Sequence, residues 1–202
     1  MSNAKLRFCY GTMASGKSLQ LLTIAYNFEQ RNIPILVLKS EIDTRDGGNI
    51  IKSRIGNGIE RNCTSISSDT NIYNYVLELN DRPKWILIDE AQFLTPEQVN
   101  QLGDIVDYLE IDVWCFGLRT DFKTNLFPGS KRLFEIADKI EELKSSCGCG
   151  RKNTVNARIT RDGNIAIAGT SIEVGGDERY TAICRKCYKE KLKKDNENGR
   201  EQ

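Results

Sequence analysis

Four short segments of the chain are apolar at nearly every position. They are Leu6–Tyr10, Ile35–Leu38, Trp85–Asp89 and Val113–Phe116. A strand with one face in solvent alternates between polar and apolar residues, whereas a strand covered on both faces does not. The pattern therefore predicts four buried strands of a central sheet.

Two further segments have the patterns of helices. Residues Ser18–Arg31 place Leu21, Leu22, Ala25 and Phe28 on one helical face. The sequence Thr-Pro-Glu-Gln at 95–98 matches a capping box with proline at the first helical position. We therefore expect a second helix that begins there and ends near Tyr108.

The alternation of strands and helices predicts an α/β fold with a mostly parallel sheet. After Cys147 the pattern changes, and short alternating segments, Val155–Thr160 and Asn164–Ala168, replace the helical periods. They predict a small β-rich unit that apolar burial alone is too weak to stabilise. We expect domains at 1–144 and 145–192, with a short helix from Arg185 that frays into a disordered polar tail at 193–202.

Composition narrows the chemistry. The 202 residues are 39% hydrophobic and 28% charged, which is typical of globular proteins and excludes a disordered or collagen-like chain. The net charge of +1 argues against a main role on duplex nucleic acid or on a membrane surface. The chain has no histidine, which excludes catalytic triads and metal sites that need one.

No segment approaches the roughly 18 apolar residues of a membrane span, and the first residues lack the apolar run of a secretory signal. The chain has seven cysteines. Without a signal segment, metal binding explains them better than disulfides do. We therefore expect a cytoplasmic protein with reduced thiols.

A glycine-rich segment matches the phosphate-binding pattern GxxxxGK[ST]. It lies between a predicted strand and a predicted helix, which is the context that the pattern requires; a fortuitous glycine turn is the alternative. The backbone N–H groups of such a loop surround phosphate oxygens, the lysine reaches the β- and γ-phosphates, and the last hydroxyl ligates Mg²⁺. The residues are Gly11, Thr12, Met13, Ala14, Ser15, Gly16, Lys17 and Ser18.

Two carboxylates follow the buried strand that begins at Trp85. Asp89 and Glu90 should lie at the carboxyl edge of the sheet beside a cation and phosphate, because an unpaired buried acidic pair is costly. In nucleoside-triphosphate enzymes of this kind the first acid supports the metal and the second faces the attacking nucleophile. The alternative is an ordinary solvated strand end.

Two close pairs of cysteines suit a tetrahedral zinc site. Cys147 and Cys149 are separated by 34 residues from Cys184 and Cys187. Four thiolates without an open position would make this zinc structural. The small unit that contains them needs such a cross-link, because its apolar burial is too weak to stabilise it. Disulfides and a redox pair are the weaker alternatives.

The motifs leave the phosphoryl acceptor open, since either water or a substrate hydroxyl fits them. Their order adds information. The glycine loop is followed by DEAQF at 89–93, GLRTDF at 117–122, the first cysteine pair, GG at 175–176, ERY at 178–180 and the second cysteine pair. From Leu6 to Tyr188 this series resembles the zinc-containing (type II) thymidine kinases, which have a RecA-like P-loop domain and a small zinc-bound lasso.

The resemblance implies transfer of the γ-phosphoryl group of ATP to the 5′-hydroxyl of thymidine, with Mg²⁺. It makes Glu90 the base on that hydroxyl and assigns Asp43, Arg45, Asp89 and Gln92 to the nucleotide site. For Asp43 and Arg45 the alternative is a solvated turn pair. Thymidine contacts map onto Met13, Phe93, Leu118, Phe122, Ser171, Ile172, Glu173, Val174, Gly175 and Tyr180.

Ordinary core packing is the alternative for the apolar members of that set. The zinc would anchor both ends of a lasso at Gly150–Ile183 that closes over the nucleoside. The family also implies a homotetramer inhibited by thymidine triphosphate, with neither nucleic acid nor membrane as a partner. Two other functions stay open: a RecA-like ATPase acting on nucleic acid, and a zinc-ribbon protein that senses nucleotide without turnover.

Overall fold

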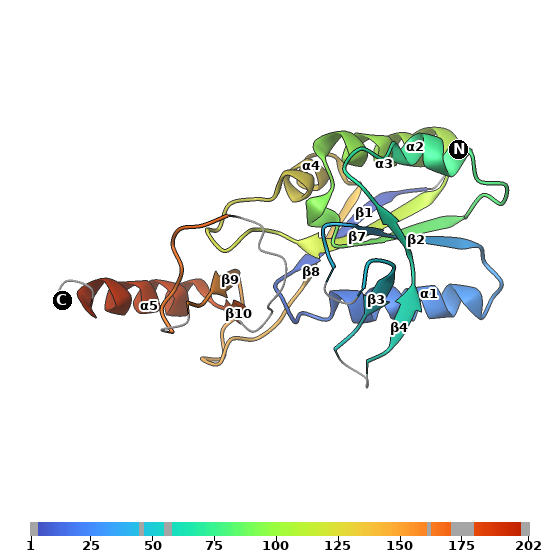
Figure 1. The fold of residues 1–202 in the computed structure, drawn as a ribbon. Coiled ribbons are helices and arrows are strands. Elements are labelled where there is room, and N and C mark those ends of the chain that lie inside the picture. Colours follow the sequence, from blue (N-terminus) through green and yellow to red (C-terminus); the bar gives the residue numbers. More distant parts are fainter. Residues whose placement is uncertain (1–3, 45–46, 55–57, 161–162, 171–179, 199–202) are drawn as a thin grey trace.

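The computed structural model describes residues 4–44, 47–54, 58–160, 163–170 and 180–198. Its centre is a six-stranded sheet with the order β5-β2-β6-β7-β1-β8, and every neighbouring pair is parallel. The predicted mostly parallel sheet is therefore confirmed (Figure 1). The strands are β1 (Leu6–Gly11), β2 (Ile35–Ser40), β5 (Thr64–Ile66), β6 (Trp85–Asp89), β7 (Asp112–Leu118) and β8 (Lys139–Leu143).

Helices cover both faces of the sheet (Figure 1). Helix α1 (Lys17–Glu29) packs on one face, where Leu21 and Leu22 meet Leu87 and Phe116. The other face carries α2 (Ile72–Leu77), α3 (Pro96–Leu109) and α4 (Pro128–Ile136), which bury Ile86 and Ile88. Because residues 86–88 alternate between two covered faces, all of them are apolar.

Helix α3 begins as the sequence predicts. The Thr95 hydroxyl accepts from the Gln98 N–H at 3.1 Å, and the Gln98 side chain accepts from the Thr95 N–H at 3.1 Å. These two bonds satisfy two N–H groups that the first turn of a helix leaves without a partner. The helix ends at Leu109, and Glu110 adopts the left-handed conformation with φ 57°. The capping box is confirmed.

Two short strands form a hairpin that the sequence analysis does not anticipate. β3 (Ile50–Lys52) and β4 (Glu60–Asn62) pair antiparallel. Lys39 on β2 donates to the Ile50 carbonyl at 3.0 Å, so the hairpin is tied to the central sheet beside the end of β2.

The segment after Cys147 forms a second, smaller unit. β9 (Val155–Arg158) and β10 (Tyr180–Ile183) pair antiparallel, and α5 (Arg185–Asn198) follows. The expected strand at 164–168 reduces to an isolated bridge between Ile165 and Ile159. A small apolar cluster of β9, residue 165 and one side of α5 holds the unit together.

Helix α5 is longer than the sequence analysis expects. It extends away from the sheet (Figure 1) and includes residues 193–198, which are helical rather than disordered. The Asp195 carboxylate accepts from the Ile165 N–H at 2.8 Å and so ties this part of the helix to the β-unit.

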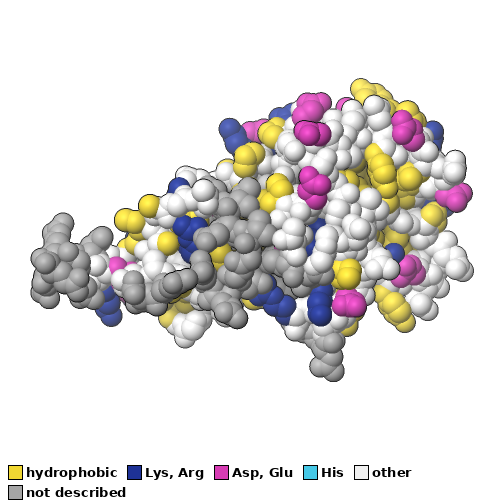
Figure 2. Space-filling model, viewed as in Figure 1, with side chains coloured by type: hydrophobic (Ala, Val, Ile, Leu, Met, Phe, Trp, Pro, Cys, Tyr) yellow, Lys and Arg dark blue, Asp and Glu magenta, His cyan; other side chains and the backbone are white. Residues whose placement is uncertain are grey.

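The surface carries charges of both signs. On the face shown in Figure 2, Lys/Arg and Asp/Glu side chains are scattered among hydrophobic and uncharged ones. Among the helices that the structure describes, none has both the length and the apolar character needed to cross a membrane.

Candidate active site and metal centre

The glycine-rich loop joins β1 to α1, so its residues lie at the carboxyl edge of the sheet. Ala14 and Gly16 adopt left-handed conformations, with φ 57° and 86°. These turns curl the chain back on itself, and the buried Lys17 ammonium donates to the Thr12 carbonyl at 2.8 Å. The loop therefore has the curvature and the buried cation that phosphate binding requires.

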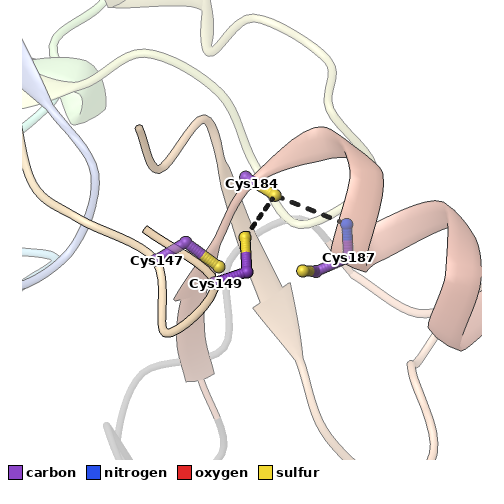
Figure 3. Close-up of side chains that lie close together, drawn as sticks. All are labelled: Cys147, Cys149, Cys184 and Cys187. Carbon is purple, nitrogen blue, oxygen red and sulfur yellow. Dashed lines mark hydrogen bonds between the residues drawn. The ribbon is translucent and has the colours of Figure 1, made fainter. Parts of the chain in front are cut away.

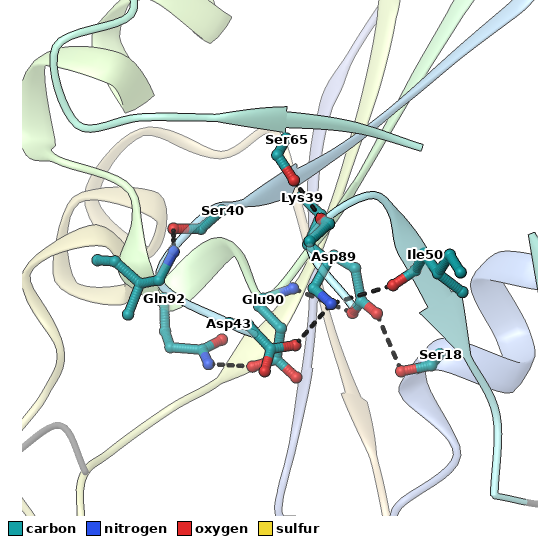
Figure 4. Close-up of polar contacts among 11 residues, drawn as sticks. Ser18, Lys39, Ser40, Asp43, Ile50, Ser65, Asp89, Glu90 and Gln92 are labelled. Carbon is teal, nitrogen blue, oxygen red and sulfur yellow. Dashed lines mark hydrogen bonds and ion pairs between the residues drawn. The ribbon is translucent and has the colours of Figure 1, made fainter. Parts of the chain in front are cut away.

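Asp89 ends β6 and faces the start of α1. Its Oδ2 accepts from the Ser18 hydroxyl at 3.0 Å, and its Oδ1 accepts from the Glu90 N–H at 3.0 Å (Figure 4). The carboxyl is buried, and this burial, followed by the charge of Glu90, raises its pKa to about 7. The partly buried Ser18 hydroxyl and the buried Asp89 carboxylate are hard oxygen donors of the kind that Mg²⁺ binds.

Glu90 follows Asp89 in a left-handed conformation with φ 52°. That turn directs the chain into the short 3-10 helix η1 (Ala91–Phe93). The Gln92 side chain donates from Nε2 to the Glu90 carboxylate, while Gln92 Oε1 accepts from the Leu118 N–H at 2.9 Å. The second acid is therefore held between the ends of β6 and β7.

A cavity opens between the glycine-rich loop and the hairpin. Its lining includes residues 13–19 of the loop and α1, Asp89 and Glu90, Leu118 at the end of β7, and residues 51–54 in and after β3 of the hairpin. The carboxyl ends of three neighbouring strands, β6, β7 and β1, meet at this point. This edge is where open parallel sheets bind ligands.

Sequence reasoning misses a buried ion pair in the wall of this cavity. Lys39 Nζ lies 3.0 Å from Asp43 Oδ2, and the two side chains are 1% and 5% exposed. Asp43 is thus part of the site, whereas its predicted partner Arg45 lies outside the described residues. The signal for Lys39 was present, since it is a lysine directly after the predicted apolar strand Ile35–Leu38.

The residues predicted to contact thymidine fall into several groups. Met13 and Leu118 line the cavity. Phe93 packs edge-to-face on Phe127, with ring centroids 5.7 Å apart. Phe122 is buried, and the Cζ atom of the Arg158 guanidinium lies 3.9 Å from the centroid of the Phe122 ring. Tyr180 begins β10. The predicted residues 171–175 lie outside the described part of the chain.

A second feature that sequence reasoning misses is the joint between the two units. Asn156 on β9 is buried, and its Oδ1 accepts from the Met13 N–H at 2.8 Å. The hydroxyls of Thr12 and Ser145 lie 2.8 Å apart at the same joint. The small unit therefore contacts the glycine-rich loop directly. Asn156 carries no recognisable motif, because its partner is 143 residues away.

The four predicted zinc ligands come together. Their sulfur atoms all lie within 4.8 Å of one another, and Sγ of Cys149 and Cys184 are 3.6 Å apart (Figure 3). Backbone N–H groups, first that of Cys149, lower the pKa of Cys147 to about 6. Four sulfur donors at this spacing suit tetrahedral Zn²⁺, which binds cysteines as thiolates.

Comparison with known proteins agrees with this site. A sequence model of the thymidine kinase family matches residues 4–188. A thymidine kinase from Streptococcus thermophilus (strain CNRZ 1066) is 47% identical over 184 residues, covering 91% of this chain and 92% of that protein. A thymidine kinase from Streptococcus pyogenes serotype M3 (strain ATCC BAA-595 / MGAS315) is 43% identical over 186 residues, covering 92% and 97%.

Among solved structures, the Pif1 helicase of Candida albicans has a TM-score of 0.42 and 14% identity. The match covers 70% of this chain and 36% of the helicase. No conclusion about function follows from a likeness of that extent.

Proposed function

Since the chain belongs to the thymidine kinase family and is an ATP-dependent kinase of thymidine, we propose how its residues divide the transfer of the γ-phosphoryl group to the 5′-hydroxyl. The observation that carries the proposal is the arrangement at the carboxyl edge of the sheet. There the Ser18 hydroxyl lies 3.0 Å from Asp89, and Glu90 lines the same cavity.

The glycine-rich loop binds the phosphates of ATP. Backbone N–H groups of the loop and the start of α1 supply a positive environment, and Lys17 exchanges the Thr12 carbonyl for phosphate oxygens. Ser18 and Asp89 would hold Mg²⁺, whose chemistry here is to neutralise charge on the β- and γ-phosphates. The position of Asp89 supports this role, because its buried carboxylate already faces the Ser18 hydroxyl at 3.0 Å.

Glu90 orients the 5′-hydroxyl of the nucleoside. An alcohol is much less acidic than a carboxylic acid, so full deprotonation before phosphoryl transfer is unfavourable. In a loose transition state Glu90 holds the hydroxyl in line and takes its proton late. Its left-handed backbone keeps the carboxylate at the cavity wall beside Asp89.

Thymidine binds on the side of the cavity formed by Met13 and Leu118. Phe93, Phe122 and Tyr180 enclose the base, together with backbone groups of residues 171–175. The four cysteines hold zinc at the ends of the lasso, and the bond that the Met13 N–H donates to Asn156 Oδ1 supports a direct link between lasso and loop. Closure of the lasso excludes water, which would otherwise compete with the hydroxyl for the phosphoryl group.

The test compares two glutamates with the same backbone conformation. Glu90 and Glu110 both have positive φ, at 52° and 57°, but Glu110 is exposed at the end of α3. We expect Glu90→Gln to lower kcat by at least about 100-fold, as loss of a general base does, with ATP binding unchanged. Glu110→Gln should keep full activity. Equal activities of the two variants would overturn the assignment of Glu90.

Further properties follow from the family resemblance. We propose a cytoplasmic homotetramer, inhibited by thymidine triphosphate, that uses neither nucleic acid nor membrane as a partner. We propose two domains at 1–144 and 145–192, with the second lengthened to residue 198 by α5. Size-exclusion chromatography with light scattering tests the tetramer, and initial rates with added thymidine triphosphate test the inhibition.

A further inference from the structure

Gln92 is a buried polar residue in the turn that carries Glu90. Its exposed fraction is only 1%, and it lies in η1 immediately after the catalytic carboxylate. Among the described residues that line the nucleotide cavity, Glu90 is included and Gln92 is not. Its side chain points toward Glu90 in Figure 4. The resemblance-based assignment of Gln92 to the nucleotide site therefore needs another explanation.

Both ends of the Gln92 amide are occupied by parts of the proposed machinery. Oε1 accepts from the Leu118 N–H at 2.9 Å, and Nε2 donates to the Glu90 carboxylate. The direction of the amide follows from its partners, because only its oxygen can accept from a backbone N–H. The Leu118 N–H of β7 therefore orients the Gln92 amide, and the Gln92 amide in turn orients the Glu90 carboxylate.

Two glycines make room for this turn. A Cβ at Gly117 would lie 2.8 Å from Gln92 Oε1 and 3.0 Å from the Gln92 backbone nitrogen. A Cβ at Gly129, in α4, would lie 2.7 Å from the Ala91 carbonyl oxygen. Contacts under 3.0 Å would force a shift, so β7 and α4 press on the turn from positions that only glycine allows. The left-handed conformation of Glu90 is thus held by tight packing on its C-terminal side.

We propose that Gln92 is a positioning residue for phosphoryl transfer, which orients the Glu90 carboxylate through its amide and is not itself a nucleotide ligand. The proposal rests on the proposed role of Glu90. A carboxylate on a half-buried side chain can rotate about its terminal bond, and displacement of a reacting group by about 1 Å costs roughly 100-fold in rate. The bond from Gln92 restricts that rotation, because it holds one oxygen of the Glu90 carboxylate.

The test is a double-mutant cycle between residues 90 and 92. Gln92→Met keeps the volume of the side chain and removes both polar ends. We expect it to lower kcat by about 10- to 100-fold, which corresponds to a lost hydrogen bond to a charged group and a misplaced base. KM for ATP should stay within about twofold. In a Glu90→Gln background the same change should lower single-turnover product formation by less than about twofold.

A matched control is available in α3. Gln101 is also buried, and its Oε1 also accepts from a backbone N–H, that of Ile72, at 2.8 Å. Gln101→Met should lower the unfolding temperature as Gln92→Met does, while kcat stays unchanged. This control separates the loss of a buried amide from the loss of orientation at Glu90.

A second variant serves if Gln92→Met fails to fold. Gly117→Ala pushes on the Gln92 amide without removing any polar group, and it should lower kcat with KM for ATP unchanged. Three results overturn the proposal: a raised KM for ATP with unchanged kcat, an equal loss in the Glu90→Gln background, or unchanged kcat in both variants. Full activity of Glu90→Gln alone would instead refute the proposed function of Glu90, so the two failures are distinguishable.

Discussion

The ion pair between Lys39 and Asp43 gives a quantitative prediction for stability. Lys39→Met removes the positive charge 3.0 Å from the buried Asp43 carboxylate, and it also removes the donor to the Ile50 carbonyl of the hairpin. Removing one partner of a buried pair costs about 3–5 kcal/mol. Since domains are stable by only about 5–15 kcal/mol, this one change should remove about a fifth or more of the free energy of unfolding.

Urea unfolding followed by far-UV circular dichroism measures the effect. Lys152→Met is the matched control, because Lys152 Nζ pairs with Glu142 at 2.6 Å in a partly exposed position and should contribute less than about 1 kcal/mol. The double variant Lys39→Met/Asp43→Asn should cost at least about 1 kcal/mol less than the sum of the single changes. A cost no larger than that of Lys152→Met, or strict additivity, would refute the reasoning.

Two other predictions concern the cysteines. Removing zinc with a chelator should raise KM for thymidine before ATP affinity falls, because the four thiolates anchor the lasso and not the glycine-rich loop; a parallel loss of both affinities, measured by titration, would contradict the anchor role. Burial raises the pKa of Cys9 to about 12 and also raises that of Cys115. At pH 9 only about one Cys9 thiol in a thousand is ionised. After zinc has been removed, iodoacetamide should therefore modify the four clustered cysteines of the folded protein but not Cys9 or Cys115. Peptide mapping that shows rapid modification of Cys9 would disprove this.

The central strands were predictable because burial on both faces leaves a continuous apolar run in the sequence. Residues 85–88 are apolar on both sides because helices cover both faces of the sheet, and β6 has the predicted bounds. The glycine-rich loop and the Thr95 capping box depend on neighbours within eight residues of one another, so their sequence patterns are complete in themselves.

Edge elements were not predictable for the opposite reason. β4 (Glu60–Asn62) has the sequence Glu-Arg-Asn, and β8 contains Lys139 and Glu141. Their composition does not resemble that of a strand, and each becomes one only by pairing with a partner that the fold supplies. The hairpin and β8 therefore appear only with the tertiary structure.

The candidate site divides in the same way. Motif spacing located the loop, the acids and the zinc ligands, whereas Lys39 and Asn156 enter through contacts between distant segments. For Gln92 the DEAQF motif predicts only its nearness to Glu90 in the chain, and the hydrogen bonds to Glu90 and Leu118 indicate how its side chain is used. The roles of Phe93, Phe122 and Tyr180 stay predictions.

The most direct test of the account follows ADP release from Mg-ATP with and without thymidine, and identifies the phosphorylated product. The account predicts release that depends on thymidine, in a one-to-one ratio with thymidine monophosphate, because closure over the nucleoside precedes transfer. ADP release at the same rate without thymidine would show that water is the acceptor, and it would contradict the assignment of Glu90 and the lasso to nucleoside phosphorylation.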